Sequence, residues 1–281
     1  MARVLTVIAL LGALGTAACG GRHGIAPTPV PVPTPGGGGD GGDGGTTTPP
    51  PPPPPPPTLK VTTIMAFGDS LTYGAVQPAV STLSVPFQPD AGLDVSYPFK
   101  LQTLETARYT SQTITVFNEG VAGNRAQDDR QRFLDDLAAG HPDVVLLMEG
   151  DNDLGDLVGL TGSALTAGIT AVVNAMEDMV RAAQGRGAVP FVATIPDQRA
   201  GAKRGQAAAL IAPYNAALKT MIAKKGAVLV DVNAQLPLSY IGADGLHPTE
   251  DGYQKLAEIF QSALAAAYEV PPATASVSAR R

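Results

Sequence analysis

Short apolar runs alternate with longer amphipathic segments from about residue 60 to about residue 270. The apolar runs are five to seven residues long and rich in Val, Ile and Phe, which predicts strands at 61–67, 113–118, 143–149, 189–195 and 228–232. In the longer segments Leu, Ile, Val and Met recur at three- and four-residue spacing, which predicts helices at 97–108, 127–139, 163–184, 206–225 and 249–268. Apolar strands that alternate with helices predict a parallel sheet covered on both faces, which is a three-layer α/β/α fold.

The residues that follow each strand are the first candidates for chemistry, because such sheets bind ligands beyond the carboxyl ends of their strands. The first strand is followed by Gly68-Asp69-Ser70, whose glycine permits a tight turn into a helix. A serine in this turn exposes its hydroxyl at a helix N-terminus, where backbone N–H groups can stabilise an anion. The alternative is that Ser70 only caps the following helix.

The loops after the second and third strands carry candidate hydrogen-bond donors. Residues 118–124 contain two glycines, which let the backbone turn closely and leave N–H groups facing a ligand, although by itself this is an ordinary loop. Asn152 follows the third strand and offers a neutral amide among acids; helix capping or turn formation would also explain it. Because Asp151, Asp153 and Asp156 lack the spacing of an EF-hand calcium loop, we expect no metal here.

His247 is the histidine best placed for catalysis. His23 lies in a region of Pro and Gly, and His141 precedes the third strand, at the wrong end of the sheet for a site. Asp244 lies three residues before His247, so its carboxylate can hold one ring nitrogen while the other faces outward. A helix-entry Asp beside a solvated His is the alternative for this pair, and Asp231 is a second candidate for the supporting acid.

Together and in this order, the four segments resemble the SGNH hydrolases, also called the GDSL esterase/lipase family. The matching blocks are Gly68-Asp69-Ser70-Leu71, Asn118 with Gly120 and Gly123, Gly150-x-Asn152-Asp153, and Asp244-x-x-His247. The resemblance spans about residues 61–268 and implies a flavodoxin-like SGNH-hydrolase fold with five parallel strands.

The resemblance also implies a serine esterase that needs no cofactor and no metal. Ser70 matches the nucleophile, His247 the base and Asp244 the acid that supports it. The oxyanion hole would consist of the N–H groups of Ser70 and Gly123 and the side-chain amide of Asn152, with Gly120 as the alternative to Gly123.

Two irregular stretches are candidates for choosing the substrate. Residues 75–96 would form a partial lid, with Tyr73 and Phe87 beside the acyl group. Residues 196–205 carry three basic side chains that could meet an acidic substrate. The alternative for each stretch is a mobile surface loop without substrate contact.

The N-terminal part of the chain resembles an export signal followed by a tether. Residues 1–18 hold one charge, Arg3, and an apolar or small-residue run that is too short to span a bilayer. Small residues precede Cys19, the only cysteine, as in a bacterial lipoprotein signal in which the cysteine is lipidated; an ordinary signal peptide is the alternative. Pro and Gly dominate 19–58, which predicts a disordered tether before a hydrolase domain at 59–270 and a disordered tail at 271–281.

Charge and cysteine content exclude one class of partner and two kinds of structural site. The domain at 59–270 has 15 basic and 23 acidic residues and no Lys/Arg run, so we expect no nucleic-acid partner. A single cysteine excludes an intrachain disulfide framework and a cysteine-based zinc site.

We therefore expect an exported, membrane-anchored, monomeric esterase of the bacterial cell envelope. Its substrate would be a small-molecule, lipid or acetylated-glycan ester. Secretion without an anchor, O-acyl transfer to a glycan, and non-catalytic glycan binding by a surface lipoprotein are the alternatives.

Overall fold

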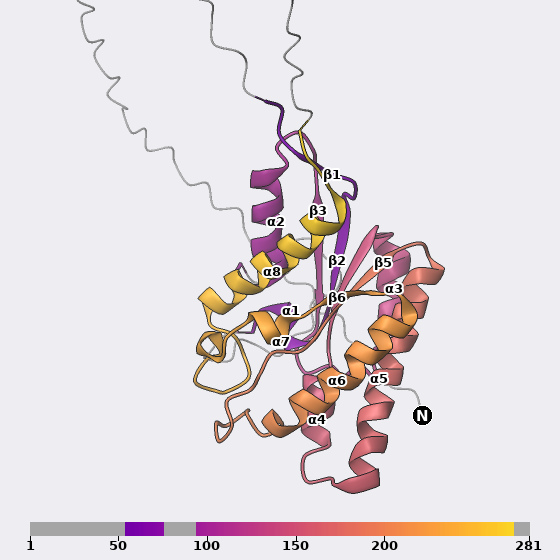
Figure 1. The fold of residues 1–281 in the computed structure, drawn as a ribbon, viewed down its shortest axis with the longest axis vertical. Coiled ribbons are helices and arrows are strands. Elements are labelled where there is room, and N and C mark those ends of the chain that lie inside the picture. Colours follow the sequence, from indigo (N-terminus) through magenta and orange to yellow (C-terminus); the bar gives the residue numbers. More distant parts are fainter. Residues whose placement is uncertain (1–53, 76–93, 273–281) are drawn as a thin grey trace, which may run out of the picture. The chain divides into compact units, whose positions relative to one another are not determined.

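A computed structural model describes residues 54–75 and 94–272, and its centre is a five-stranded parallel sheet (Figure 1). The strand order is β3-β2-β4-β5-β6. The strands are β2 (Thr63–Gly68), β3 (Thr115–Gly120), β4 (Val144–Met148), β5 (Val189–Ala193) and β6 (Val228–Val230). The prediction of five parallel strands is confirmed, and the order 2-1-3-4-5 along the chain is the flavodoxin-like one.

Helices cover both faces of this sheet, so the three-layer prediction is also confirmed (Figure 1). α2 (Tyr97–Arg108) and α8 (Glu250–Tyr268) pack together on one face. α3 (Arg130–Gly140), α5 (Gly162–Gly185) and α6 (Ala208–Lys225) form the layer on the other face. The bounds of these five helices differ from the sequence-based ranges by three residues or fewer.

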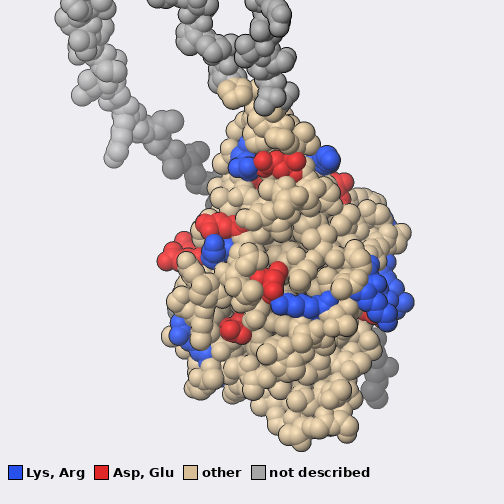
Figure 2. Space-filling view, viewed as in Figure 1, with Lys and Arg blue, Asp and Glu red and all other residues tan. Residues whose placement is uncertain are grey.

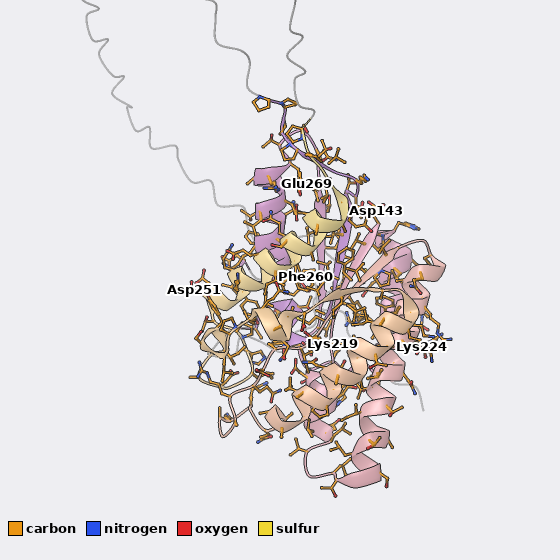
Figure 3. The ribbon with its side chains drawn as sticks, viewed as in Figure 1. Asp143, Lys219, Lys224, Asp251, Phe260 and Glu269 are labelled. Carbon is orange, nitrogen blue, oxygen red and sulfur yellow. The ribbon has the colours of Figure 1, made fainter. Side chains whose placement is uncertain are left out.

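The middle of the sheet forms the core. Every side chain of β4 is fully buried, which explains why this strand is an uninterrupted apolar run instead of an alternating one. Aromatic pairs join the layers: Phe67 of β2 meets Phe133 of α3 edge-on at 4.8 Å, and Tyr97 of α2 stacks on Phe260 of α8 at 4.7 Å between ring centroids (Figure 3).

Six short elements lie outside the predicted ranges, although the turn at Ser70 was expected to lead into a helix. They are β1 (Thr58–Leu59), α1 (Ser70–Tyr73), α4 (Asp151–Asp156), α7 (Val232–Gln235), the 3₁₀ helix η1 (Leu238–Tyr240) and β7 (Glu269–Val270). Each has two to six residues, too few for a hydrophobic period to show. Short helices follow three of the strands directly and carry or flank the candidate residues.

β1 and β7 pair antiparallel and bring the two ends of the domain together. The carboxylate of Glu269 accepts hydrogen bonds from Arg108 Nε at 2.6 Å and from the Tyr109 hydroxyl at 2.8 Å (Figure 3 labels Glu269). Because β2 begins four residues after β1, this pair lies at the amino end of the sheet.

Several sequence-based predictions concern residues outside the described ranges. Cys19, the signal at 1–18, the tether up to residue 53, Phe87 and the tail from residue 273 belong to this group. In the parts of the chain that are described, no helix has the length and apolar character to cross a membrane.

The described surface carries charged side chains in small groups (Figure 2). On the face shown, the described residues form no extended basic surface of the kind that follows a nucleic-acid backbone. Lys224 and Lys225 lie in the last turn of α6, where their positive charges interact favourably with the negative end of the helix dipole.

Candidate active site

Ser70 is the first residue of α1, directly after the carboxyl end of β2. Asp69 caps this helix, because its Oδ1 accepts a hydrogen bond from the Leu71 N–H at 2.9 Å. The interpretation of Ser70 as the helix cap is therefore wrong. Its side chain is 6% exposed, and its hydroxyl faces the loop that carries His247.

Ser70, His247 and Asp244 form one chain of hydrogen bonds. His247 Nε2 lies 3.0 Å from Ser70 Oγ, and His247 Nδ1 lies 2.6 Å from Asp244 Oδ2. The other oxygen of Asp244 accepts the backbone N–H groups of Leu246 and His247, both at 3.1 Å. The carboxylate thus fixes the local backbone as well as the imidazole, and it leaves Nε2 to meet the serine.

The loop between β5 and α6 supports this arrangement from outside. Arg199 Nε donates to the carbonyl oxygen of Ile241 at 2.8 Å, and the Arg199 N–H donates to Gly245 O at 2.9 Å. The Arg204 N–H donates to Asp244 O at 2.7 Å. Arg199 is one of the three basic residues in 196–205 that were considered for contact with an acidic substrate. In the structure, its Nε stabilises the Asp244 loop instead.

Gly120 and Gly123, the two candidates for the second oxyanion donor, differ in their surroundings. The Gly120 N–H already donates to Asn118 Oδ1 at 3.0 Å, and a Cβ on Gly120 would lie 2.1 Å from Tyr73 N, so this glycine serves the close packing of β3 on α1. Gly123 has φ = +88°, is exposed, and a Cβ there would meet nothing within 4 Å among the described residues.

Asn152 lies in the first turn of α4, immediately behind the Ser70 turn. Its Nδ2 donates to the carbonyl oxygen of Asn124 at 2.8 Å and lies 3.4 Å from Asp69 Oδ2. Asp153, the next residue, accepts the N–H groups of Ala126 and Gln127 at 2.9 and 3.2 Å. The loop with Gly123 and the helix with Asn152 are therefore joined at several points.

Asp151, beside Asn152, does not behave as an ordinary surface carboxylate. Burial raises its pKa to about 7, although Gln198 Nε2, at 3.1 Å from its Oδ1, favours the charged form. Burial and then the neighbouring Asp151 also raise the pKa of Asp69 well above its usual range. These shifts reduce the negative charge next to the candidate oxyanion hole.

Three further residues were candidates in the sequence analysis: Asp231, Tyr73 and Phe87. Asp231 binds Lys219 Nζ at 2.6 Å and Thr194 Oγ1 at 3.0 Å, so its carboxylate is engaged by partners from α6 and β5 (Figure 3 labels Lys219). Tyr73 is 9% exposed at the end of α1, and Phe87 is outside the described residues. The described part of the chain holds no group of three or more His, Cys, Asp or Glu placed to bind a metal ion.

The sequence also matches a known protein family. A model of the GDSL-like lipase/acylhydrolase family matches residues 66–255, about two thirds of the sequence and all four candidate segments. The chain belongs to this family. Membership makes it a carboxylic ester hydrolase, and the resemblance to SGNH hydrolases is confirmed.

Crystal structures of two enzymes share the fold of this GDSL-family chain. Axe2, an acetylxylan esterase from Geobacillus stearothermophilus, is 21% identical, with a TM-score of 0.58 over 73% of this chain and 96% of that one. LAE5, an α/β hydrolase from the metagenome of Lake Arreo, Spain, is 20% identical, with a TM-score of 0.58 over 73% and 95%. No curated protein matches the chain by sequence.

The electrostatics of His247 differ from the sequence-based expectation. A neighbouring carboxylate was expected to push its pKa upward. Burial instead lowers the pKa of His247, and Arg204 adds to this, so that together they outweigh the opposite effect of Asp244. The buried ring pays a desolvation cost for becoming charged that the sequence could not reveal.

This shift predicts the pH profile of the GDSL-family enzyme. As the expected base, His247 must be neutral to accept the Ser70 proton, so kcat/KM should be fully developed at pH 7 and fall only as the pH drops through a value below the ordinary ~6.5 of histidine. Asp244→Asn removes a contribution that raises this pKa, so the limb should move to lower pH and the plateau should fall roughly 10²–10⁴-fold.

The measurement is kcat/KM against pH on one soluble ester. Asp231→Asn is the matched control, because it removes a carboxylate that pairs with Lys219, and its profile should match the wild type. A wild-type limb above ~6.5, or equal plateaus for Asp244→Asn and the wild type, would contradict the prediction.

Proposed function

We propose that the chain is an exported, lipid-anchored serine esterase that hydrolyses carboxylic esters with Ser70, His247 and Asp244. The observation that carries this proposal is the continuous hydrogen-bonded chain from Asp244 through His247 to Ser70, at 2.6 and 3.0 Å. Each link has the atom that the chemistry needs: a carboxylate on Nδ1, and a hydroxyl on Nε2.

The first half of the reaction forms an acyl-enzyme. His247 Nε2 accepts the Ser70 proton while Ser70 Oγ attacks the ester carbonyl, and the carbonyl oxygen becomes an oxyanion. Asp244 stabilises the imidazolium that results. His247 then gives the proton to the leaving alcohol as the carbon–oxygen bond breaks.

The oxyanion would be held by the N–H groups of Ser70 and Gly123 and by the side-chain amide of Asn152. Ser70 N–H lies at the start of α1, and Gly123 is an exposed residue on its loop. Loss of one such donor typically costs ~10²–10³ in rate, or roughly 2.7–4 kcal/mol of transition-state stabilisation.

In the second half, water attacks the acyl-enzyme with the same residues in the same roles, which releases the acid and restores Ser70. A sugar hydroxyl in place of water would make the protein an O-acyltransferase. Both reactions use the same triad, so the products distinguish them: free acid for hydrolysis, a new glycan ester for transfer.

An acetylated glycan is the substrate class that we favour. The shared fold with the acetylxylan esterase Axe2 supports it, and export would bring the enzyme into contact with such polymers. A non-catalytic glycan-binding protein would have no need for the short Ser70–His247–Asp244 contacts, and a serine-directed fluorophosphonate would not label it.

The lipid anchor rests on the sequence around Cys19. The small residues Ala17 and Ala18 precede this single cysteine at the end of an apolar run. A diacylated N-terminus followed by a region of Pro and Gly would hold the esterase domain at a distance from the membrane.

Ser70→Ala should remove nearly all esterase activity and fluorophosphonate labelling without unfolding the protein, because only the nucleophile's hydroxyl is lost. Activity would be measured on p-nitrophenyl esters of increasing acyl length and on acetylated xylo-oligosaccharides. Ser262→Ala, which removes an exposed hydroxyl on α8, is the matched control and should keep full activity. More than a tenth of wild-type turnover in Ser70→Ala would place the nucleophile elsewhere.

Exhaustive chelation should leave the activity unchanged, because no step of the proposed mechanism uses a metal ion. The test compares turnover before and after dialysis against EDTA. Loss of turnover that calcium or zinc restores would overturn this part of the mechanism.

Cys19→Ala should move the protein from the membrane fraction to the soluble fraction of a bacterial host and abolish incorporation of labelled fatty acid. Ser70→Ala should stay with the membranes, which shows that fractionation does not depend on activity. Equal amounts of soluble protein from Cys19→Ala and the wild type would sink the anchor hypothesis.

A further inference from the structure

A chain of hydrogen bonds runs from Asn152, a candidate oxyanion donor, through Asn124 to Asp129. The Asn152 amide donates to the carbonyl oxygen of Asn124 at 2.8 Å, and the Asn124 amide donates to Asp129 Oδ1 at 2.6 Å. Asn124 directly follows Gly123. One residue therefore sets the orientation of the Asn152 amide and lies beside the second oxyanion donor.

Asp129 does not have the function that its position in the chain favours. It occupies the N-cap position of α3, where Asp side chains usually accept the first free N–H groups of a helix, yet it makes no such bond. Its side chain turns instead toward Asn124 and Arg132, and the residue is only 4% exposed.

Arg132 ties Asp129 to the two strands that lead into the site. Its guanidinium pairs with the Asp129 carboxylate and donates to the carbonyl oxygens of Glu119 at 2.7 Å and Gly68 at 3.1 Å. It also stacks on the ring of Phe67, 3.8 Å from Cζ to the centroid. The carbonyls belong to the next-to-last residue of β3 and the last residue of β2, so Arg132 fixes Asp129 relative to both strands.

Glu149, the residue directly after β4, is a buried carboxyl group near this cluster. It is 0% exposed, and neither of its carboxyl oxygens meets an N–H or hydroxyl donor among the described residues. Burial, and then the neighbouring Asp129, raise the pKa of Glu149 well above its usual range, which favours its neutral form.

We propose that Asp129 is a positioning residue for the oxyanion hole, held by Arg132 and acting through Asn124 on the Asn152 amide and the Gly123 loop. It touches neither the substrate nor the reacting atoms. The inference rests on the proposed function, since it presumes that Asn152 and Gly123 hold the oxyanion.

Removal of Asp129 should affect the transition state more than the bound substrate. Without its acceptor, the Asn124 amide can rotate, and the carbonyl that fixes Asn152 can move with it. A displacement of about 1 Å in a positioning group can cost on the order of 10²-fold in rate. Because the oxyanion exists only after attack, kcat should fall while KM changes little.

The experiment measures kcat and KM of Asp129→Ala on a soluble ester, together with the affinity for a boronic acid that forms a tetrahedral adduct on Ser70. We expect kcat to fall about 10–100-fold, KM to stay within about threefold, and boronate affinity to fall with kcat/KM. Asp129→Asn keeps an acceptor oxygen for Asn124 and should retain more activity than Asp129→Ala.

Asp136→Asn is the matched control. Asp136 also lies beside Arg132, 3.6 Å from Nη1, but its carboxylate makes no hydrogen bond to Asn124. Its kcat should match the wild type.

Asn124→Ala supplies the same test should Asp129→Ala not fold, because it removes the amide that Asp129 holds. A folded Asp129→Ala with wild-type kcat, or with a raised KM alone, would overturn the inference. Ser70→Ala separates this from failure of the proposed function: if Ser70→Ala is inactive and Asp129→Ala is not impaired, only the positioning role is wrong. If Ser70→Ala stays active, the serine mechanism itself fails.

Discussion

Parallel pairing of β2 with β3 and with β4 is the interaction on which the site depends. The register places Gly68 opposite both Gly120 and Met148, so the three strands end at the same level. Ser70, Gly123 and Asn152 follow these ends within a few residues. A slip of one residue in either pairing would move a donor by about 3.3 Å relative to the nucleophile, more than an oxyanion contact tolerates.

The same convergence buries several carboxyl groups around a reaction that develops negative charge. Ionised Asp69, Glu149 and Asp151 would oppose the oxyanion, since like charges in a region of low dielectric interact strongly. Burial raises the pKa of each of the three, which favours their neutral forms. Arg132 compensates Asp129 directly. Burial also lowers the pKa of His247. The same physical cause therefore favours the uncharged form of these acids and of the histidine.

The sequence predicts the sheet and the candidate residues because their patterns are local. Five apolar runs imply the strands, and strand-end positions single out Ser70 and Asn152. The unsuitable places of the other two histidines, and Asp244 three residues before it, single out His247. The choice between Gly120 and Gly123 needed the structure, since both glycines fit the pattern and only the packing against Tyr73 separates them. Burial likewise depends on neighbours distant in sequence. For this reason the predicted direction of the His247 pKa shift was wrong, and no sequence pattern pointed to the contact between Asp129 and Asn124.

The ends of the domain and the site lie at opposite ends of the sheet. β1 and β7 pair where β2 begins, and Glu269 ties them to Arg108 and Tyr109 (Figure 1). Ser70 follows the other end of β2, about 20 Å away for six residues at roughly 3.3 Å each. The first and last described residues of the domain therefore lie at the end of the sheet that is remote from Ser70, and the loops at the other end are left to the candidate site.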